Sequence, residues 1–193
     1  MVDKRITAIN IRTIPMRIVF SALLLLPAVS HTFSQRYIAE DGVISFFSDA
    51  PVEDITATNR NVTSIFTAST GAIAFSVPIR HFEFEKKLMK EHFNDKYMES
   101  DRFPRSTFSG TITGYSMTAT GPQRVRAKGK LTIHGIVKEI DVPGSFEVKD
   151  HAIHMKTRFT VLLADYGIKI PQLLWENISE EIQISVDLTY NPK

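Results

Sequence analysis

Apolar and polar residues alternate along most of the chain after residue 35, which is the pattern of a β-strand with one buried face. The clearest case is residues 124–134, where odd positions are apolar or glycine and even positions are basic, threonine or histidine. Residues 72–79, 106–115, 153–161 and 182–190 alternate in the same way. With the shorter stretches between them they indicate about eight strands, and we predict an all-β, eight-stranded antiparallel barrel because closure removes exposed strand edges.

Several segments bend or interrupt this alternation. The pair at residues 41–42, Asp-Gly, predicts a tight turn between two short strands. Residues 52–70 mix Thr, Asn and Ser with scattered apolar residues, and they fit either an irregular strand or a long surface connection. The apolar parity changes before residues 82–84, which predicts a β-bulge. Gly110 and Gly114 lie on an apolar face and predict a sharp bend or a close approach of backbones.

One segment departs from the strand pattern. From Phe84 to Met98 the apolar residues follow a helical spacing and the charged residues lie between them, so we predict a short helix. Such a helix must bury its apolar stripe, and in a barrel the available surface is the open end. It either plugs that end or covers an apolar pocket, for which Met89 and Met98 would make a pliable lining. Periodicity alone favours the plug.

The first 30 residues are typical of an export signal. Four basic residues precede the apolar run at residues 18–29, and small residues follow at 28–30. We therefore predict a signal peptide over residues 1–30, a domain over residues 31–193, and a periplasmic or secreted protein. Translation from Met1 or from Met16, cleavage four residues later, and an uncleaved anchor remain alternatives.

Charge and cysteine content narrow the classes of partner. The chain has 23 basic and 21 acidic residues, but four of the basic and one of the acidic residues lie in the first 30, which leaves 19 and 20. The remainder is nearly neutral, so no nucleic-acid partner is predicted. The absence of cysteine excludes disulfides, thiolate metal sites, cysteine nucleophiles and a lipid anchor on a modified cysteine.

The titratable residues do not form a recognisable catalytic or metal motif. His151 and His154 are three apart on a predicted strand and therefore point to opposite faces, which disfavours chelation of one ion. Glu83 and Glu85 share a strand face, but beside two lysines they fit a solvated rim better than a catalytic pair. Nucleophile-elbow, phosphate-loop and dinucleotide motifs are absent. No catalytic residue, metal or cofactor is predicted.

Basic residues form a stripe on one face of the 124–134 strand, at positions 124, 126, 128 and 130. Such a stripe could attract an anionic head group or a membrane surface. It equally fits the outer face of a barrel, where charge discourages sheet-to-sheet aggregation, and this second interpretation is favoured.

Two stretches resemble a known family. The sequences FEFEKKLMKEHFNDKYMESDRFPRSTFSG (residues 82–110) and GKLTIHGIVKEIDVP (residues 129–143) closely resemble the YceI-like proteins, and DYGIKIP (residues 165–171) resembles one of their turns. The resemblance spans most of the chain after the predicted signal. It implies an eight-stranded antiparallel lipocalin-like barrel with one short helix near its mouth, and an apolar tunnel that holds a polyprenyl tail or a similar amphiphile. It implies no catalytic residues.

The resemblance reverses the preference for a plug and favours a helix that covers a lipid pocket. The ligand-binding residues that we predict on this basis are Phe75, Val77, Phe82, Phe84, Leu88, Met89, Phe93, Met98, Phe103, Phe108, Ile112, Leu131, Ile133, Phe146, Met155 and Phe159. His92, Glu99, Asp101 and His134 are expected to fix the helix and turns through hydrogen bonds. The chain departs from the family at Leu162-Leu163-Ala164, where relatives often have polar residues, so its head-group preference is expected to differ.

The leading hypothesis is non-enzymatic binding of a polyisoprenoid, quinone or fatty-acyl lipid, for carriage, storage or stress response outside the cytoplasm. A barrel with a filled core that acts as a protein-interaction module is the alternative. An enzyme that acts on a lipid head group through His92 or His134 is a third hypothesis. Transient contact with a membrane surface and a homodimer are left open.

Overall fold

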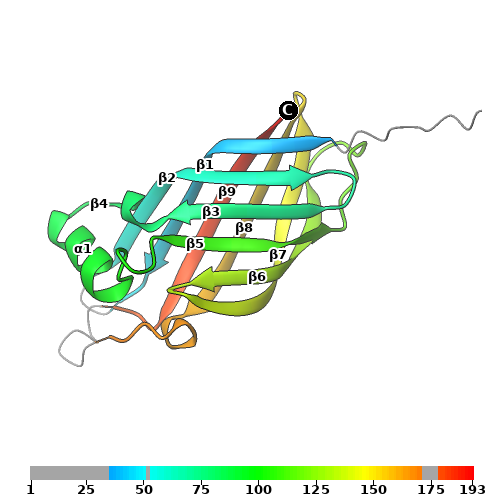
Figure 1. Ribbon diagram of the computed structural model, residues 1–193. Helices are drawn as coiled ribbons and strands as arrows, with labels where there is room; N and C mark the ends of the chain where they lie inside the picture. The colour runs from blue at the N-terminus through cyan, green and yellow to red at the C-terminus, as the bar shows by residue number, and fades with distance from the viewer. Residues whose placement is uncertain (1–34, 51–52, 171–177) are drawn as a thin grey trace, which may run out of the picture. The chain divides into compact units, whose positions relative to one another are not determined.

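The computed structural model describes residues 35–193 except 51–52 and 171–177. The predicted signal peptide and its cleavage site lie outside the described residues. Eight long strands dominate the described part (Figure 1). They are β1 (Arg36–Ser48), β2 (Ile55–Thr67), β3 (Ala72–Pro78), β5 (Arg105–Thr113), β6 (Gln123–Ile133), β7 (Ile136–Lys149), β8 (Ala152–Leu162) and β9 (Glu181–Pro192).

These strands form a closed antiparallel barrel, as the alternation predicts. The order is β1-β9-β8-β7-β6-β5-β3-β2, and β2 pairs back to β1 to close the ring. A ninth, two-residue strand, β4 (Glu83–Phe84), pairs only with the start of β2. All pairings are antiparallel, which explains why the strands carry one apolar and one polar face.

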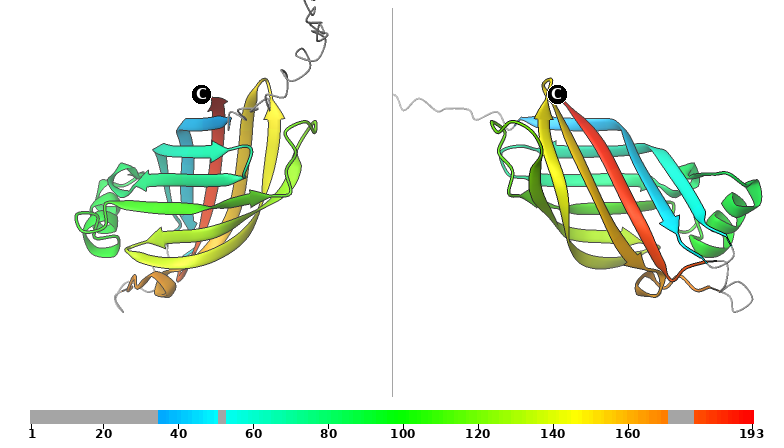
Figure 2. Two further views of the ribbon diagram at one scale, coloured as in Figure 1. Left: turned by 45° about the vertical axis from the view of Figure 1, so that its right-hand side comes forward. Right: turned by 180° about the vertical axis from the view of Figure 1, so that it is seen from behind.

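The two ends of the barrel differ in their connections (Figures 1 and 2). At one end lie the short helix α1 (Lys87–His92), the π-helical turn η2 (Phe93–Tyr97) and the 3-10 turns η1 (Ile79–His81) and η3 (Leu163–Tyr166). We call this the helix end. At the other, the closed end, lie the β2–β3, β5–β6 and β7–β8 connections and the C-terminus.

Three local predictions need correction or completion. The pair at residues 41–42 is not a turn, because β1 runs through it and its register with β2 shifts around Gly42. A Cβ atom at Gly42 would overlap the Leu188 side chain, so the glycine serves close packing inside the barrel. Residues 52–70 contain β2, and the irregular strand is the alternative that holds, because the burial alternation of β2 breaks at residues 60–61 where its register with β1 shifts. The parity change before Phe82 comes from the turn η1 and not from a β-bulge.

The predicted close approach at Gly110 is confirmed. Gly110 of β5 lies opposite Gly129 of β6, and the Phe108 ring lies beside both. A Cβ atom on Gly110 would lie 2.8 Å from the tip of that ring, and one on Gly129 would lie 3.0 Å from it. The glycine pair is therefore a notch that accepts the Phe108 ring.

Aromatic side chains fill the closed end of the barrel. Phe66 lies at the centre, with its ring centroid 5.4 to 6.5 Å from the centroids of four other rings. The five residues, which we call the aromatic plug, are Tyr37, Phe66, Tyr115, Phe146 and Tyr190. Phe66, Phe146 and Tyr190 are fully buried. This half of the barrel is a packed core.

Hydrogen bonds fix two of the three phenols of the plug. The Tyr190 hydroxyl lies 2.7 Å from Ser64 Oγ, which itself donates to the Ala74 carbonyl. The Tyr115 hydroxyl donates to the Ala68 carbonyl at 2.7 Å. Burial raises the pKa of Tyr190 well above its ordinary range, and the hydrogen bond between Tyr190 and Ser64 offsets this only in part. Burial also raises the pKa of Tyr115.

Candidate functional site: an apolar cavity at the helix end

The helix-end half of the barrel encloses a cavity of about 300 Å³. Its walls are inward-facing side chains of β1, β3, β6, β8 and β9, among them Ile44, Val77, Leu131, Phe159 and Ile184. These residues alternate with outward-facing polar ones, so the barrel closure turns every apolar strand face toward the same space. The lining is almost entirely apolar, which suits a hydrocarbon ligand.

A cluster of phenylalanine rings borders the cavity at its outer end. The cluster consists of Phe46, Phe82, Phe84 and Phe93, and all four line the cavity. Phe93 stacks on Phe46 at 5.4 Å between centroids and lies 5.5 Å from Phe82 and 5.0 Å from Phe84. Because Phe93 belongs to η2 and Phe46 to β1, this mouth cluster attaches the helical segment to the barrel wall.

The helical segment covers the hollow end without filling it. Met89, His92, Phe93, Tyr97 and Met98 all line the cavity, which remains open behind them. The prediction of a short helical segment is confirmed, but it covers residues 87–97, is split into α1 and η2, and leaves Phe84 in β4. A plug exists in this barrel, but four strand residues and Tyr115, which follows β5, form it at the closed end.

Few polar groups reach the cavity. Ser48, Glu53, His92 and Ser106 contribute to its lining, and none of the described lining residues is Lys or Arg. The Glu53 carboxylate accepts a hydrogen bond from the Lys86 ammonium at the rim, and this bond raises the pKa of Lys86. Burial raises the pKa of Tyr97 and of Tyr166, so both phenols stay neutral at physiological pH.

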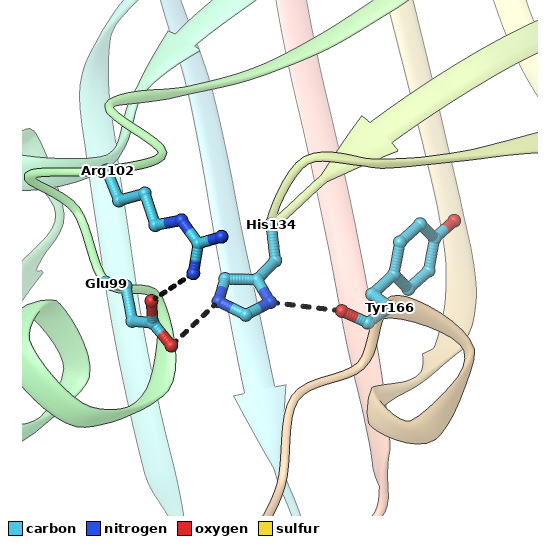
Figure 3. A network of polar contacts seen from close by, with 4 residues as sticks. All are labelled: Glu99, Arg102, His134 and Tyr166. Carbon is cyan, nitrogen blue, oxygen red and sulfur yellow. Dashed lines mark hydrogen bonds and ion pairs between the residues drawn. The ribbon is translucent and has the colours of Figure 1, made fainter.

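A polar network holds three loops together beside the cavity (Figure 3). His134 Nδ1 lies 3.2 Å from the Tyr166 carbonyl oxygen, and because a carbonyl only accepts, the Nδ1–H donates. The opposite ring nitrogen, Nε2, faces the Glu99 carboxylate at 3.6 Å, and Glu99 also pairs with Arg102 at 3.4 Å. The network joins the loop after η2, the β6–β7 turn and η3.

Backbone strain accompanies this network. Glu99 has φ 42° and His134 has φ 50°, values that non-glycine residues rarely adopt. The His134 side chain is only 12% exposed, and the Phe103 ring packs against it at 4.5 Å. Polar contacts of Glu99 and His134 to neighbouring turns agree with the prediction from the resemblance. Asp101 pairs with Arg80, whereas His92 lines the cavity.

Ten of the sixteen predicted ligand-binding residues line the cavity. They are Phe75, Val77, Phe82, Phe84, Met89, Phe93, Met98, Leu131, Ile133 and Phe159. Their role as ligand contacts stays a prediction. The ten side chains surround one apolar space.

The other six predicted residues lie outside this lining. Leu88 points to solvent and is 61% exposed, because it lies on the outer side of α1. Phe103 packs between His134 and the Arg102 guanidinium. Four more face the barrel interior but lie deeper than the cavity, in the packed half, where neighbouring side chains cover them: Phe108, Ile112, Phe146 and Met155.

The prediction missed the contribution of β1, β9 and η3. Phe46 of β1, Ile182 and Ile184 of β9, and Tyr166 of η3 all line the cavity. The alternation at residues 182–190 already placed Ile182 and Ile184 on one face, so this signal was present in the sequence. The erroneous turn at residues 41–42 hid the full length of β1.

The basic stripe of β6 lies opposite acidic residues of β7. Arg126 forms an ion pair with Asp141 at 2.8 Å, and the strand register places Lys130 opposite Glu139. This cross-strand neutralisation fits an ordinary outer barrel face better than an anion-binding surface. The described residues contain no group of three or more His, Asp or Glu side chains arranged to hold a metal ion. No helix in the described ranges is both long and apolar enough to cross a membrane.

A closed eight-stranded antiparallel barrel with an apolar cavity at one end is a lipocalin-like barrel. A family model described as the YceI-like domain matches residues 30–190, and the chain belongs to this family. A comparison with curated proteins gives no significant match.

Solved structures show the same fold. A polyisoprenoid-binding domain from Saccharophagus degradans, implicated in plant cell wall breakdown, has TM-score 0.70 and 14% identity, covering 83% of this chain and 99% of its own. BcnA of Burkholderia cenocepacia has TM-score 0.65 and 15% identity, covering 77% and 95%. The YCEI protein of Campylobacter jejuni has TM-score 0.57 and 13% identity, covering 74% and 86%. At these identities the likeness concerns the fold.

Proposed function

We propose that the protein binds an isoprenoid or similar amphiphilic lipid in the helix-end cavity, without catalysing a reaction on it. The observation that carries this proposal is the hollow, almost wholly apolar half of a barrel whose other half is tightly packed. The polyisoprenoid binding of the Saccharophagus degradans domain, which has the same fold, supports the same class of ligand.

Simple energetics favour a hydrocarbon occupant. Each CH₂ group moved from water into such a cavity contributes about 0.8 kcal/mol to the free energy of binding. The contributions of even a short tail therefore add up to a measurable affinity. A charged or strongly polar ligand would find few partners in the interior, since the polar lining groups are two serines, one glutamate and one histidine besides the tyrosine phenols. Polyisoprenoids, quinones and fatty-acyl lipids all have an apolar tail that suits this lining.

We place this binding outside the cytoplasm, in the periplasm or after secretion, where the protein would carry, store or sense its lipid. The support is the basic leader and apolar run of the first 30 residues. Sequencing the N-terminus of the protein recovered from the periplasmic fraction tests this part, and a start near residue 31 or 35 is expected. A start at residue 1 or 16 in the cytoplasmic fraction would contradict it.

Native mass spectrometry of gently purified protein, followed by organic extraction, tests the binding itself. We expect a stoichiometric adduct that extracts as a prenyl chain, a quinone or a fatty acyl lipid. If the purified protein is empty, lipids of all three classes are added back before the measurement. Failure of the folded protein to retain any of them would overturn the proposal.

A pair of matched variants localises the bound lipid. Ile184→Trp fills the cavity from β9 and is expected to abolish lipid retention. Ile65→Trp makes the same change on the outer surface of β2, where the side chain is 49% exposed, and is expected to leave retention unchanged. Equal retention in the two variants would mean that the lipid binds elsewhere.

A further inference from the structure

The cavity ends partway along the barrel, at a definite layer of side chains. On β9 its lining runs from Ile182 to Val186, which is about 13 Å along a strand. The next inward-facing residue, Leu188, is 2% exposed and does not line the cavity. On β8 the lining includes Phe159, whereas Met155 is 6% exposed and lies beyond it. These two side chains belong to a floor beneath the cavity.

Glycine notches allow this floor to close tightly. Leu188 lies directly over Gly42 of β1, where a Cβ atom would overlap its Cδ2 atom and would lie 3.3 Å from Val62. On the opposite wall, Phe108 lies in the notch formed by Gly110 and Gly129. Its ring stacks on that of the cavity-lining Phe75 at 5.2 Å. Bulky side chains from both walls are thus seated in glycine notches.

The aromatic plug lies behind the floor and leaves no room for it to move deeper. The plug rings contact one another, and hydrogen bonds to Ser64 and to the Ala68 carbonyl fix two of its phenols. A tail that entered this region would have to separate Phe66 from Tyr190 and break a buried hydrogen bond. A loss of that kind is costly because the separated polar groups would remain buried without partners.

We infer that the cavity is a blind pocket that buries only a short length of a prenyl or alkyl chain, whatever the total length of that chain. The inference rests on the proposed function, since it specifies the lipid class of the same site. A volume of 300 Å³ corresponds to about ten groups of the size of a water molecule, and hence to a tail of about ten carbon atoms. Longer tails bind with their excess length outside the mouth and gain no further affinity from it.

A series of prenyl alcohols with five, ten, fifteen, twenty and forty carbons tests this inference. The protein produced from the full sequence is offered equimolar mixtures, and native mass spectrometry reports which alcohol is retained. Because each buried CH₂ strengthens binding about fourfold, the step from five to ten carbons is expected to tighten binding at least tenfold. The step from twenty to forty carbons is expected to change it less than threefold.

Variants of the floor residues test whether this layer of side chains sets the length of tail that the cavity buries. The plateau is the chain length beyond which affinity no longer rises. Met155→Ala opens the floor and is expected to move the plateau to a longer alcohol. Ile153→Ala removes a similar volume one inward position further from the cavity, in the packed half, and is expected to leave the plateau unchanged. Val186→Phe shortens the pocket and is expected to move the plateau to a shorter alcohol, so a result is obtained even if the alanine variants do not fold.

The outcomes separate this inference from the proposed function. A plateau that moves with Met155→Ala or Val186→Phe supports the length limit. Affinity that keeps rising up to forty carbons overturns the length limit and leaves lipid binding intact. Retention of no alcohol of any length overturns the inference, and loss of binding by fatty-acyl lipids and quinones as well overturns the proposed function.

Discussion

The two ends of this barrel are built from the same eight strands, yet one is hollow and the other is solid. At the closed end, Phe66 touches four other aromatic rings and is fully buried. At the helix end, four phenylalanines also form a cluster, but all of them border an open cavity. The number of aromatic residues therefore does not decide whether a barrel end is filled.

The difference lies in where the rings point and what fixes them. The plug rings come from opposite walls, meet at the barrel axis, and include tyrosines whose hydroxyls bond to the wall. The rings of the mouth cluster come from β1, from residues 82–84 and from the helical segment, and all four line the cavity. This cluster leaves the space behind it open, whereas rings that meet from opposite walls close it.

The largest effect on stability is expected from a substitution in the aromatic plug, and a smaller one from the same substitution in the mouth cluster. Phe66→Ala should lower the free energy of unfolding by about 3–5 kcal/mol, because it leaves a void in a packed core. Phe93→Ala should cost less than half as much, since one side of that ring already faces the cavity. Urea denaturation of both variants measures the difference, and equal losses would contradict the contrast between a solid and a hollow end.

The next largest loss of stability is expected when the buried hydrogen bond between Ser64 and Tyr190 is removed. Ser64→Ala should cost about 1–3 kcal/mol because it leaves the Tyr190 hydroxyl buried without its partner. Tyr190→Phe should cost about 1 kcal/mol, since Ser64 still donates to the Ala74 carbonyl. The double variant should cost less than the sum of the two. Additive losses would mean that the hydroxyls do not interact.

Alkaline pH should weaken the closed end. Burial raises the pKa of Tyr190 in the folded state, whereas in the unfolded chain this tyrosine ionises near pH 10. The unfolded state therefore loses its proton first, and the free energy of unfolding should fall above about pH 10, by up to about 1.4 kcal/mol per pH unit for this group. Tyr190→Phe should show a shallower fall in urea denaturation at pH 9 to 11. An identical slope in both proteins would contradict this assignment.

The smallest effect is expected in the network beside the cavity. Glu99→Gln removes a carboxylate that faces His134 and Arg102 but is itself 43% exposed. It should cost less than about 1 kcal/mol at low ionic strength, and less still in 1 M salt. A loss above 2 kcal/mol that persists in high salt would show that this network carries the stability here assigned to the closed end.

The alternation of the sequence was sufficient to predict the barrel, and helical spacing was sufficient to predict the segment that covers it. Both signals are local, since they depend on neighbouring residues along one element. The wrong prediction of a turn at residues 41–42 also came from a local signal. An Asp-Gly pair favours a turn, but tertiary packing of Leu188 onto Gly42 kept β1 continuous.

Depth along the barrel could not be predicted in this way. Phe159 and Met155 share one face of β8 and look equivalent in the sequence, yet Phe159 lines the cavity and Met155 lies in the floor. Their difference depends on which residues the other strands bring to the same level. Register and closure decide that, and neither can be read from one strand alone.

A crystal structure of the protein with bound farnesol would test the central claim most directly. The account predicts a prenyl chain between Val77, Phe159 and Ile184, ending above Leu188 and Met155, with Phe66 and Tyr190 in unchanged contact. A chain that passes between Phe66 and Tyr190 to the closed end would contradict it.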